Sequence, residues 1–195
     1  MTRTFSYKLR EWLASEQPKT IANLESVFVG KSFAVAFLIL MSIPALPLPT
    51  GGLSHLTEII TLLLATELLF GQQTPWLPKR WRNLSLGKVM EKKALPTFTR
   101  LIAWFERFSK PRLHHLLKRR VSLRLMGVVI ILFTLGAFLA PPFSGLDTLP
   151  ALGVVLIALS LLLEDIVILL LGLASGLAGI ALEISLGSVL FHFLR

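Results

Sequence analysis

Five runs of apolar residues, separated by polar or helix-breaking stretches, dominate the chain. They cover residues 32–46, 53–70, 125–140, 149–163 and 166–182. Each run is shorter than the ~20 residues that a helix needs to cross a ~30 Å hydrocarbon core at right angles. The pattern therefore predicts an all-α integral membrane protein built from short helices that either just reach across the bilayer or turn back within it.

Two stretches rich in proline and glycine, here called the breakers, interrupt this pattern. The first is PALPLPTGG at 44–52 and the second is APPFSGLDTLP at 140–150. Because proline ends a helix, each breaker predicts a turn that joins two short helices into a hairpin. The tip of each hairpin lies either at the far interface or at mid-depth, where protein or a water-filled cavity must satisfy its backbone. The breaking residues are Pro47, Pro49, Gly51, Gly52, Pro141, Pro142 and Gly145.

The two hairpins resemble each other, which predicts an internal repeat. Shifting the chain by 93 residues places Pro49 on Pro142 and Gly52 on Gly145, with several leucines also aligned. Both hairpins follow a basic segment, so we expect parallel copies. In transporters with internal repeats, broken helices form the substrate site where the repeats meet.

Basic residues are concentrated outside the apolar runs. Five Lys or Arg precede residue 32, fourteen lie in 79–124, and Arg195 alone follows. The positive-inside rule places such segments in the cytoplasm, where they also contact anionic lipid headgroups. Apolar residues at helical spacing in 5–13 and 98–108 predict amphipathic helices on the membrane surface.

These features divide the chain into four parts. They are an amphipathic cytoplasmic or interfacial N-terminus at 1–31, the first hairpin at 32–70, a basic cytoplasmic connector with an interfacial helix at 71–124, and the second hairpin with a further C-terminal membrane helix at 125–195.

Composition narrows the classes of protein. The chain is 54% hydrophobic and 16% charged with a mean hydropathy of +0.73, which is too apolar for a soluble domain. A net charge of +9 would suggest nucleic acid in a soluble chain, but membrane-flanking basic loops explain it, so no nucleic-acid partner is expected. The absence of cysteine excludes thiolate catalysis and Cys-based metal sites.

Three ionisable residues lie within the second apolar run. His55 and Glu58 are one helical turn apart just after the first breaker, and Glu67 lies further along. An ionisable group inside an apolar span is costly, which makes it a functional candidate. The His55–Glu58 pair either carries protons or lies near the far interface, where the two side chains only bond each other. No third ligand is assignable, so no metal site is expected.

Further acidic residues lie near the second hairpin. Asp147, in the second breaker, is either part of a polar site or an ordinary helix cap. Glu164 and Asp165 stand between two apolar runs, at a solvated bend or at that same site, and adjacent carboxylates do not form an acid–base dyad by spacing alone. Glu183 has no obvious partner. No phosphate loop, dinucleotide fingerprint or nucleophile elbow appears, so neither enzymatic activity nor a cofactor is expected.

The last run contains Gly172 and Gly176 in a small-xxx-small pattern. This spacing lets helices approach closely, either within the chain or between subunits of a homo-oligomer.

Four motifs carry a resemblance to a known family. In order, PALPLPTGGL, PWLPKR, FERFSKPRL and PPFSGLDTLPALGVVLIALSLLLED resemble the ExoD family of bacterial membrane proteins, which is linked by name to exopolysaccharide synthesis. The resemblance covers roughly residues 20–182 and implies a multi-pass protein of the bacterial inner membrane associated with polysaccharide production. It implies no catalytic residues. Gly145 stands where the family pattern often has Asn.

Two hypotheses follow for function. The first is a small transporter with a polar site between the hairpins, formed by His55, Glu58, Glu67, Asp147, Glu164 and Asp165. The second is a non-catalytic scaffold or regulator whose basic cytoplasmic loop organises polysaccharide-synthesis proteins. A membrane enzyme ranks third, because the sequence shows neither a catalytic acid–base dyad nor a set of metal ligands.

Overall fold

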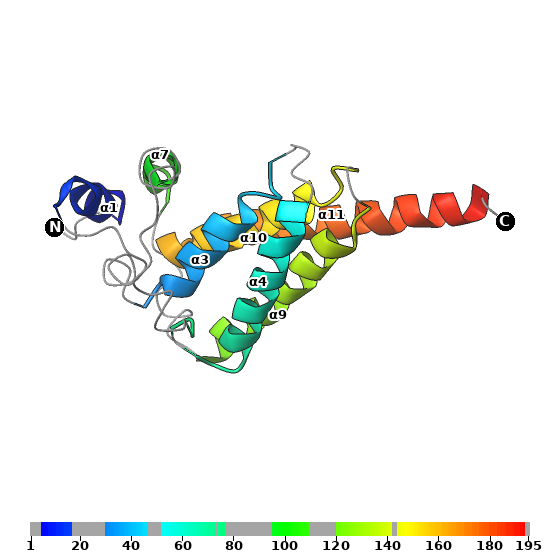
Figure 1. The fold of residues 1–195 in the computed structure, drawn as a ribbon, viewed down its shortest axis with the longest axis horizontal. Coiled ribbons are helices and arrows are strands. Elements are labelled where there is room, and N and C mark those ends of the chain that lie inside the picture. The colour runs from blue at the N-terminus through cyan, green and yellow to red at the C-terminus, as the bar shows by residue number, and fades with distance from the viewer. Residues whose placement is uncertain are drawn as a thin grey trace.

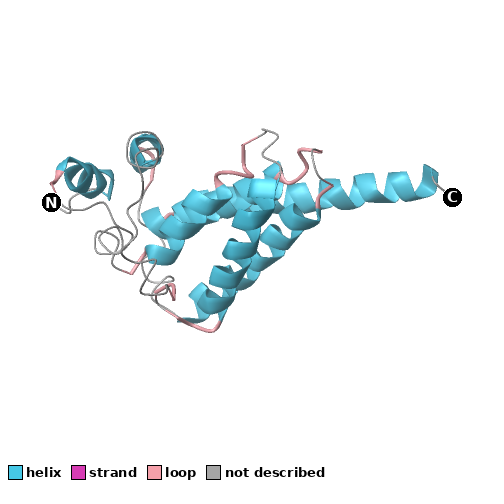
Figure 2. Cartoon of the chain, viewed as in Figure 1, coloured by secondary structure: helices cyan, strands magenta, loops and turns pink. Residues whose placement is uncertain are grey.

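The computed structural model describes residues 5–16, 30–46, 52–72, 74–76, 95–109, 120–141 and 144–193. Within these ranges the chain forms seven helices and no strands (Figures 1 and 2). The helices are α1 (Phe5–Ala14), α3 (Ser32–Met41), α4 (Gly52–Leu69), α7 (Leu95–Glu106), α9 (Arg120–Leu139), α10 (Thr148–Leu163) and α11 (Ile166–Phe193). Each of the five apolar runs is largely covered by one of these helices, which confirms the predicted all-α class.

Two groups of helices make up the bundle. Helices α3, α10 and α11 lie side by side, while α4 and α9 form a pair that leans away from them (Figure 1). Helix α10 is the centre of the fold, because it packs against α3, α9 and α11. Helices α1 and α7 pack on each other at the end of the molecule far from the C-terminus (Figure 1).

The contact between α10 and α11 depends on glycine. A Cβ atom added to Gly153 would lie 2.7 Å from the Cα of Gly176, and one added to Gly176 would overlap the ring of Phe133. Gly172 likewise faces Gly153 and Ile157 of α10. The small-residue pattern thus serves close packing within the chain, one of the two alternatives that its spacing allowed.

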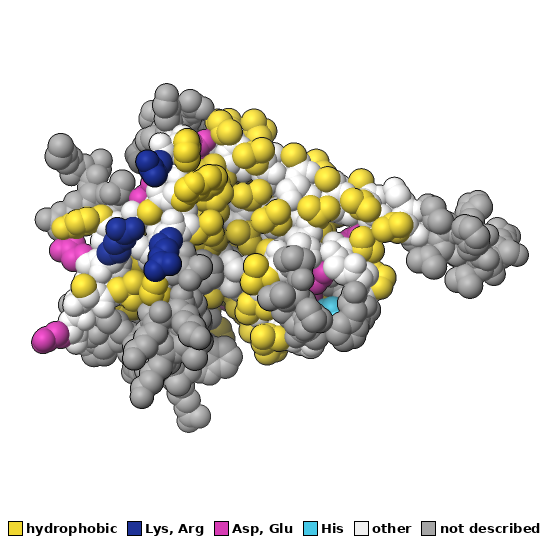
Figure 3. Space-filling model, turned by 90° about the horizontal axis from the view of Figure 1, so that it is seen from above, with side chains coloured by type: hydrophobic (Ala, Val, Ile, Leu, Met, Phe, Trp, Pro, Cys, Tyr) yellow, Lys and Arg dark blue, Asp and Glu magenta, His cyan; other side chains and the backbone are white. Residues whose placement is uncertain are grey.

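Three helices are long and apolar enough to cross a membrane: Gly52–Leu69, Val121–Leu139 and Ile166–Leu186. They expose large apolar side chains, among them Leu56, Leu63, Leu125, Leu132, Leu139, Leu170, Leu177 and Ile184. Apolar side chains cover much of the bundle, and basic ones gather at the end that carries α1 and α7 (Figure 3). Such extensive exposed apolar surface is typical of a protein that contacts lipid.

The breakers lie where helices end, as predicted. The first apolar run is helical only to Met41, followed by turns through Ala45, and α4 begins at Gly52. After α9, Gly145 has φ +70°, a left-handed conformation that glycine adopts without strain. The other breaking residues Pro47, Pro49, Gly51 and Pro142 lie outside the described residues.

Candidate functional site

Four ionisable side chains come together at the end of the bundle where the breakers lie. His55 and Glu58 come from the first turns of α4, Asp147 directly precedes α10, and Glu183 comes from α11. Asp147 lies within electrostatic range of the other three. We call these four residues the breaker-end cluster.

Helix α9 forms one wall of this cluster. The ring of His55 meets the edge of Phe138 at a centroid distance of 5.3 Å. A Cβ atom at Gly136 would lie 3.5 Å from Oε2 of Glu183, so the absence of a side chain there makes room for the carboxyl group. The site is therefore built from α4, α9, α11 and the residue that precedes α10.

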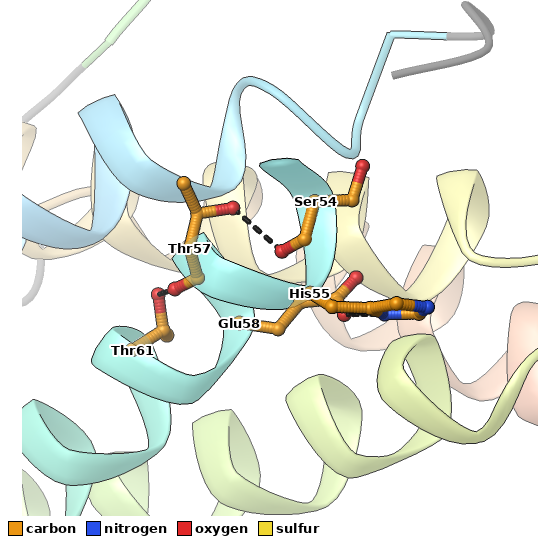
Figure 4. Close-up of polar contacts among 5 residues, drawn as sticks. All are labelled: Ser54, His55, Thr57, Glu58 and Thr61. Atoms are coloured by element: carbon orange, nitrogen blue, oxygen red, sulfur yellow. Dashed lines mark hydrogen bonds and ion pairs between the residues drawn. The ribbon is translucent and has the colours of Figure 1, made fainter. Parts of the chain in front are cut away.

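Glu58 is the most buried member of the cluster, with an exposed fraction of 0%. Its Oε2 lies 2.9 Å from Nδ1 of His55, and the two side chains lie against each other in Figure 4. Its Oε1 is buried and has no hydrogen-bond partner. A buried carboxyl oxygen without a partner carries a full desolvation cost, so it needs an explanation other than fold stability.

Hydroxyl groups on α4 do not relieve this cost. Thr57 donates to the backbone oxygen of Ser54 and Thr61 to that of Thr57, each at 2.8 Å (Figure 4). Both donors are therefore used within the helix. The hydroxyls of Thr134 and Ser160 are buried without a hydrogen-bond partner on α9 and α10.

Glu183 is the member that sequence reasoning missed. Its Oε1 is also buried without a hydrogen-bond partner, and its neighbours are Gly136 of α9 and Asp147, which directly precedes α10. No sequence spacing reveals such a contact. The available signal was the presence of a carboxylate inside an apolar run, a feature that marks functional candidates in membranes.

Asp147 differs from an ordinary cap residue. It occupies the N-cap position of α10, yet its side chain makes no capping hydrogen bond. Burial raises the pKa of Asp147 above its ordinary value, while the backbone N–H groups of Asp147 and Thr148 and, more weakly, the nearby His55 act in the opposite direction. Of the predicted site residues, the structure brings together His55, Glu58 and Asp147.

The other three predicted site residues lie elsewhere. Glu67 lies at the opposite end of α4, where its Oε2 accepts a hydrogen bond from the backbone N–H of Trp76 at 2.8 Å. Asp165 accepts one from the backbone N–H of Val167 at 2.8 Å, so it caps the start of α11. Glu164 pairs with Lys31, whose Nζ lies 2.9 Å from its Oε1.

Lys31 and Glu164 form a second polar group that also includes the backbone oxygen of Leu162. The Lys31 ammonium donates to that oxygen at 2.6 Å, and Glu164 has φ +58° where α10 ends. We call these three residues the Lys31 cluster. It joins the start of α3 to the turn between α10 and α11.

The two clusters differ in charge. The breaker-end cluster holds three carboxyl groups and one imidazole, whereas the Lys31 cluster pairs one cation with one anion. Within the described residues, no three His, Asp or Glu side chains are placed to hold a metal ion. The chemistry best suited to the breaker-end cluster is transfer of protons between carboxylates and imidazole.

Comparison with known proteins agrees with the sequence motifs. The family model described as "Exopolysaccharide synthesis, ExoD" matches residues 5–185. The chain is 27% identical over 199 residues to the uncharacterized protein slr1875 of Synechocystis, covering 96% of this chain and 88% of that one. It is 26% identical over 174 residues to Protein ExoD of Rhizobium meliloti, covering 84% and 69%. No solved structure matches. The chain belongs to the ExoD family, which is associated with exopolysaccharide synthesis.

Proposed function

We propose that this protein is a small transporter of the bacterial inner membrane that supports exopolysaccharide synthesis and moves protons through the breaker-end cluster. The observation that carries the proposal is Glu58, a fully buried carboxyl group with one oxygen on His55 and the other without a partner. Ionisable groups inside membrane helices most often mark ion and proton pathways.

The geometry of the pair suits stepwise proton transfer. The His55 side chain is 38% exposed while that of Glu58 is fully buried, so imidazole is the group of the pair that can take up a proton from outside the bundle and pass it inward. Transfer along the 2.9 Å contact turns imidazolium and carboxylate into neutral imidazole and carboxylic acid. Asp147 and Glu183 supply the next carboxyl groups.

Helix lengths support breakers that lie within the bilayer. Helix α3 has 10 residues and α10 has 16, which correspond to about 15 Å and about 24 Å at 1.5 Å per residue. Both lengths fall short of a ~30 Å hydrocarbon core. The other arms of the hairpins, α4 and α9, have 18 and 20 residues and are long enough to cross. It is therefore the short helices α3 and α10 that favour a breaker-end cluster inside the membrane over one at its far surface.

Helix pairing supports the internal repeat. Helix α3 packs on α10, and α4 packs on α9. In the predicted repeat, α3 of the first copy corresponds to α9 of the second, and α4 corresponds to α10. The contact of α3 with α10 is therefore the repeat equivalent of the contact of α9 with α4. A site between such copies is the arrangement seen in many secondary transporters.

The proposal can be tested in cells by measuring exopolysaccharide output. A host strain lacking its own family member would be complemented with the wild type, E58Q or E67Q at equal membrane levels. We expect E58Q to lose nearly all of the output, because glutamine cannot take up and release a proton. E67Q is the matched control, since Glu67 lies on the same helix but accepts its hydrogen bond from Trp76. Full output from E58Q would refute the transporter.

The alternative function is a scaffold that organises polysaccharide-synthesis proteins in the cytoplasm. It is favoured by the fourteen basic residues in 79–124, of which Arg100, Arg107 and Arg124 are exposed. Reversing the charges in 112–120 would then abolish partner recovery and polysaccharide output, while E58Q would retain both. The transporter proposal predicts the opposite polysaccharide output for each variant: E58Q should lose it, and charge reversal in 112–120 should leave it largely unchanged.

A further inference from the structure

An open hollow of about 370 Å³ lies between α1 and α7, away from the breaker-end cluster. It is lined by Arg10, Leu13 and Ala14 of α1 and by Pro96, Thr99 and Arg100 of α7. Its surface thus combines two guanidinium groups with apolar side chains.

The walls of this hollow are fixed by specific contacts. The backbone N–H of Ser6 donates to Oε1 of Glu106 at 3.0 Å, and the Ser6 hydroxyl donates to Oε2 of the same carboxylate. Leu9, Trp12 and Ile102 are buried in the core. The two helices therefore hold the hollow open as a defined shape rather than as a gap between independent segments.

The two arginines are available to a ligand. Arg10 and Arg100 are exposed, and among the described residues neither forms an ion pair with a carboxylate. Glu106, the acidic residue near the end of α7, uses both oxygens on Ser6. Guanidinium groups bind phosphate through paired N–H donors, which makes two of them in one hollow well suited to a phosphate group.

Aromatic side chains on or beside the same two helices indicate where the ligand comes from. Tyr7 of α1, Trp104 of α7 and Phe108, in the turn after α7, are exposed by 50%, 56% and 71%. Exposed Trp and Tyr are typical of the membrane–water interface, the level at which lipid phosphates lie. An apolar lining of Leu13, Ala14 and Pro96 suits the glycerol and the first acyl carbons of a lipid.

We propose that the hollow between α1 and α7 binds the phosphate headgroup of an anionic membrane lipid such as phosphatidylglycerol, with Arg10 and Arg100 as the phosphate ligands. The site holds the α1–α7 pair at the membrane surface. It is independent of the transporter proposal, because it lies at the end of the molecule that carries the Lys31 cluster, where Lys31 lies 5.7 Å from the Phe5 ring centroid.

The test titrates the purified full-length protein with phosphatidylglycerol and measures the Kd of the first bound lipid by native mass spectrometry. We expect the double variant R10Q/R100Q to weaken binding by about tenfold, as for the loss of one to two charge-assisted hydrogen bonds. The matched control K8Q/R107Q removes the same charge from exposed positions on the same two segments, outside the hollow. It should change the Kd by less than about twofold.

Equal weakening by the two double variants would overturn the proposal, because it would indicate attraction by net charge alone. If inorganic phosphate displaced the lipid at a similar concentration, the ligand would be free phosphate and not a lipid, which would overturn the proposal. If phosphatidylcholine bound as tightly as phosphatidylglycerol, the proposed preference for an anionic headgroup would be wrong. The single variants R10Q and R100Q keep the test decisive if the double variant does not fold; each should weaken binding measurably.

Discussion

The two ends of α10 carry polar groups of opposite kinds. At its C-terminal end, Glu164 meets Lys31 and each charge has a partner. Near its N-terminal end, Asp147 belongs to a cluster in which Glu58 and Glu183 each keep one buried oxygen without a hydrogen bond. The same helix thus ends in a neutralised ion pair on one side and in an excess of carboxylates on the other.

This difference separates polar groups that stabilise the fold from polar groups that serve the protein's activity. A paired charge that also bonds a helix-end carbonyl, as Lys31 does with Leu162, stabilises the joint between helices. Carboxyl groups that keep a buried oxygen without a hydrogen-bond partner destabilise a bundle, so their presence calls for a role in the protein's activity. Substitutions in the two clusters should therefore change stability with opposite sign.

Removing Lys31 should give the largest loss of stability. In K31M, Glu164 loses its cation and the Leu162 carbonyl loses its donor, while both charged side chains are only 27% and 19% exposed. We expect the free energy of unfolding to fall by about 2 kcal/mol, between the values for exposed and buried pairs. Thermal unfolding in detergent measures this change. The double variant K31M/E164Q should lose less than the sum of the single variants, and strict additivity would show that the pair does not interact.

Two substitutions of Glu164 distinguish the contribution of its ion pair to stability from the cost of its backbone strain. Both E164Q and E164G remove the charge, but only glycine relieves the left-handed conformation at φ +58°. E164G should therefore be more stable than E164Q by about 1 kcal/mol, as measured by the same unfolding experiment. Equal stability of the two variants would argue against strain at this position.

Neutralising Glu58 or Glu183 should have the opposite effect. E58Q and E183Q replace a carboxylate that has an unpaired buried oxygen, so the free energy of unfolding should stay the same or rise by up to about 1 kcal/mol. A clear loss of stability in both variants would assign these residues a structural role, like that of Lys31.

The pH dependence of stability should show the smallest effect. Burial raises the pKa of Asp147, so the folded state disfavours its ionised form. The stability that Asp147 contributes to the folded state is fully present when the pH lies below the ordinary aspartate pKa. It is lost as the pH rises through the raised pKa of the folded state. Wild type should therefore lose stability relative to D147N over that window. His55, Glu58 and Glu183 surround the group and are common to both proteins, so the difference in Tm between the two isolates Asp147. A pH-independent difference would contradict the burial of its charge.

The sequence predicted the helices better than it predicted their contacts. Apolar runs and breakers gave the five bundle helices, since both signals are local. Proline at position 44 explains why α3 ends at Met41, short of the apolar run at 32–46. The repeat and the hairpin geometry stay predictions.

The candidate site was predictable only in part. His55 and Glu58 share a helix turn, so spacing alone identified them as a pair. Glu183 joins them through the packing of α11 on α10, and Lys31 meets Glu164 across 131 or more residues of chain, neither of which a local pattern contains. Glu67 looked equivalent to Glu58 because both lie in one run, yet nine residues of helix place it about 13 Å away along the axis.

Proton flux through the purified protein tests the central claim most directly. The full-length chain would be reconstituted into liposomes containing a pH-sensitive dye, and the rate of internal pH change would follow an imposed proton gradient. We predict a flux above that of empty liposomes for the wild type and E67Q, and a loss of at least about tenfold in E58Q without a loss of thermal stability. Equal flux in E58Q and the wild type would contradict the account and leave the breaker-end cluster without a transport role.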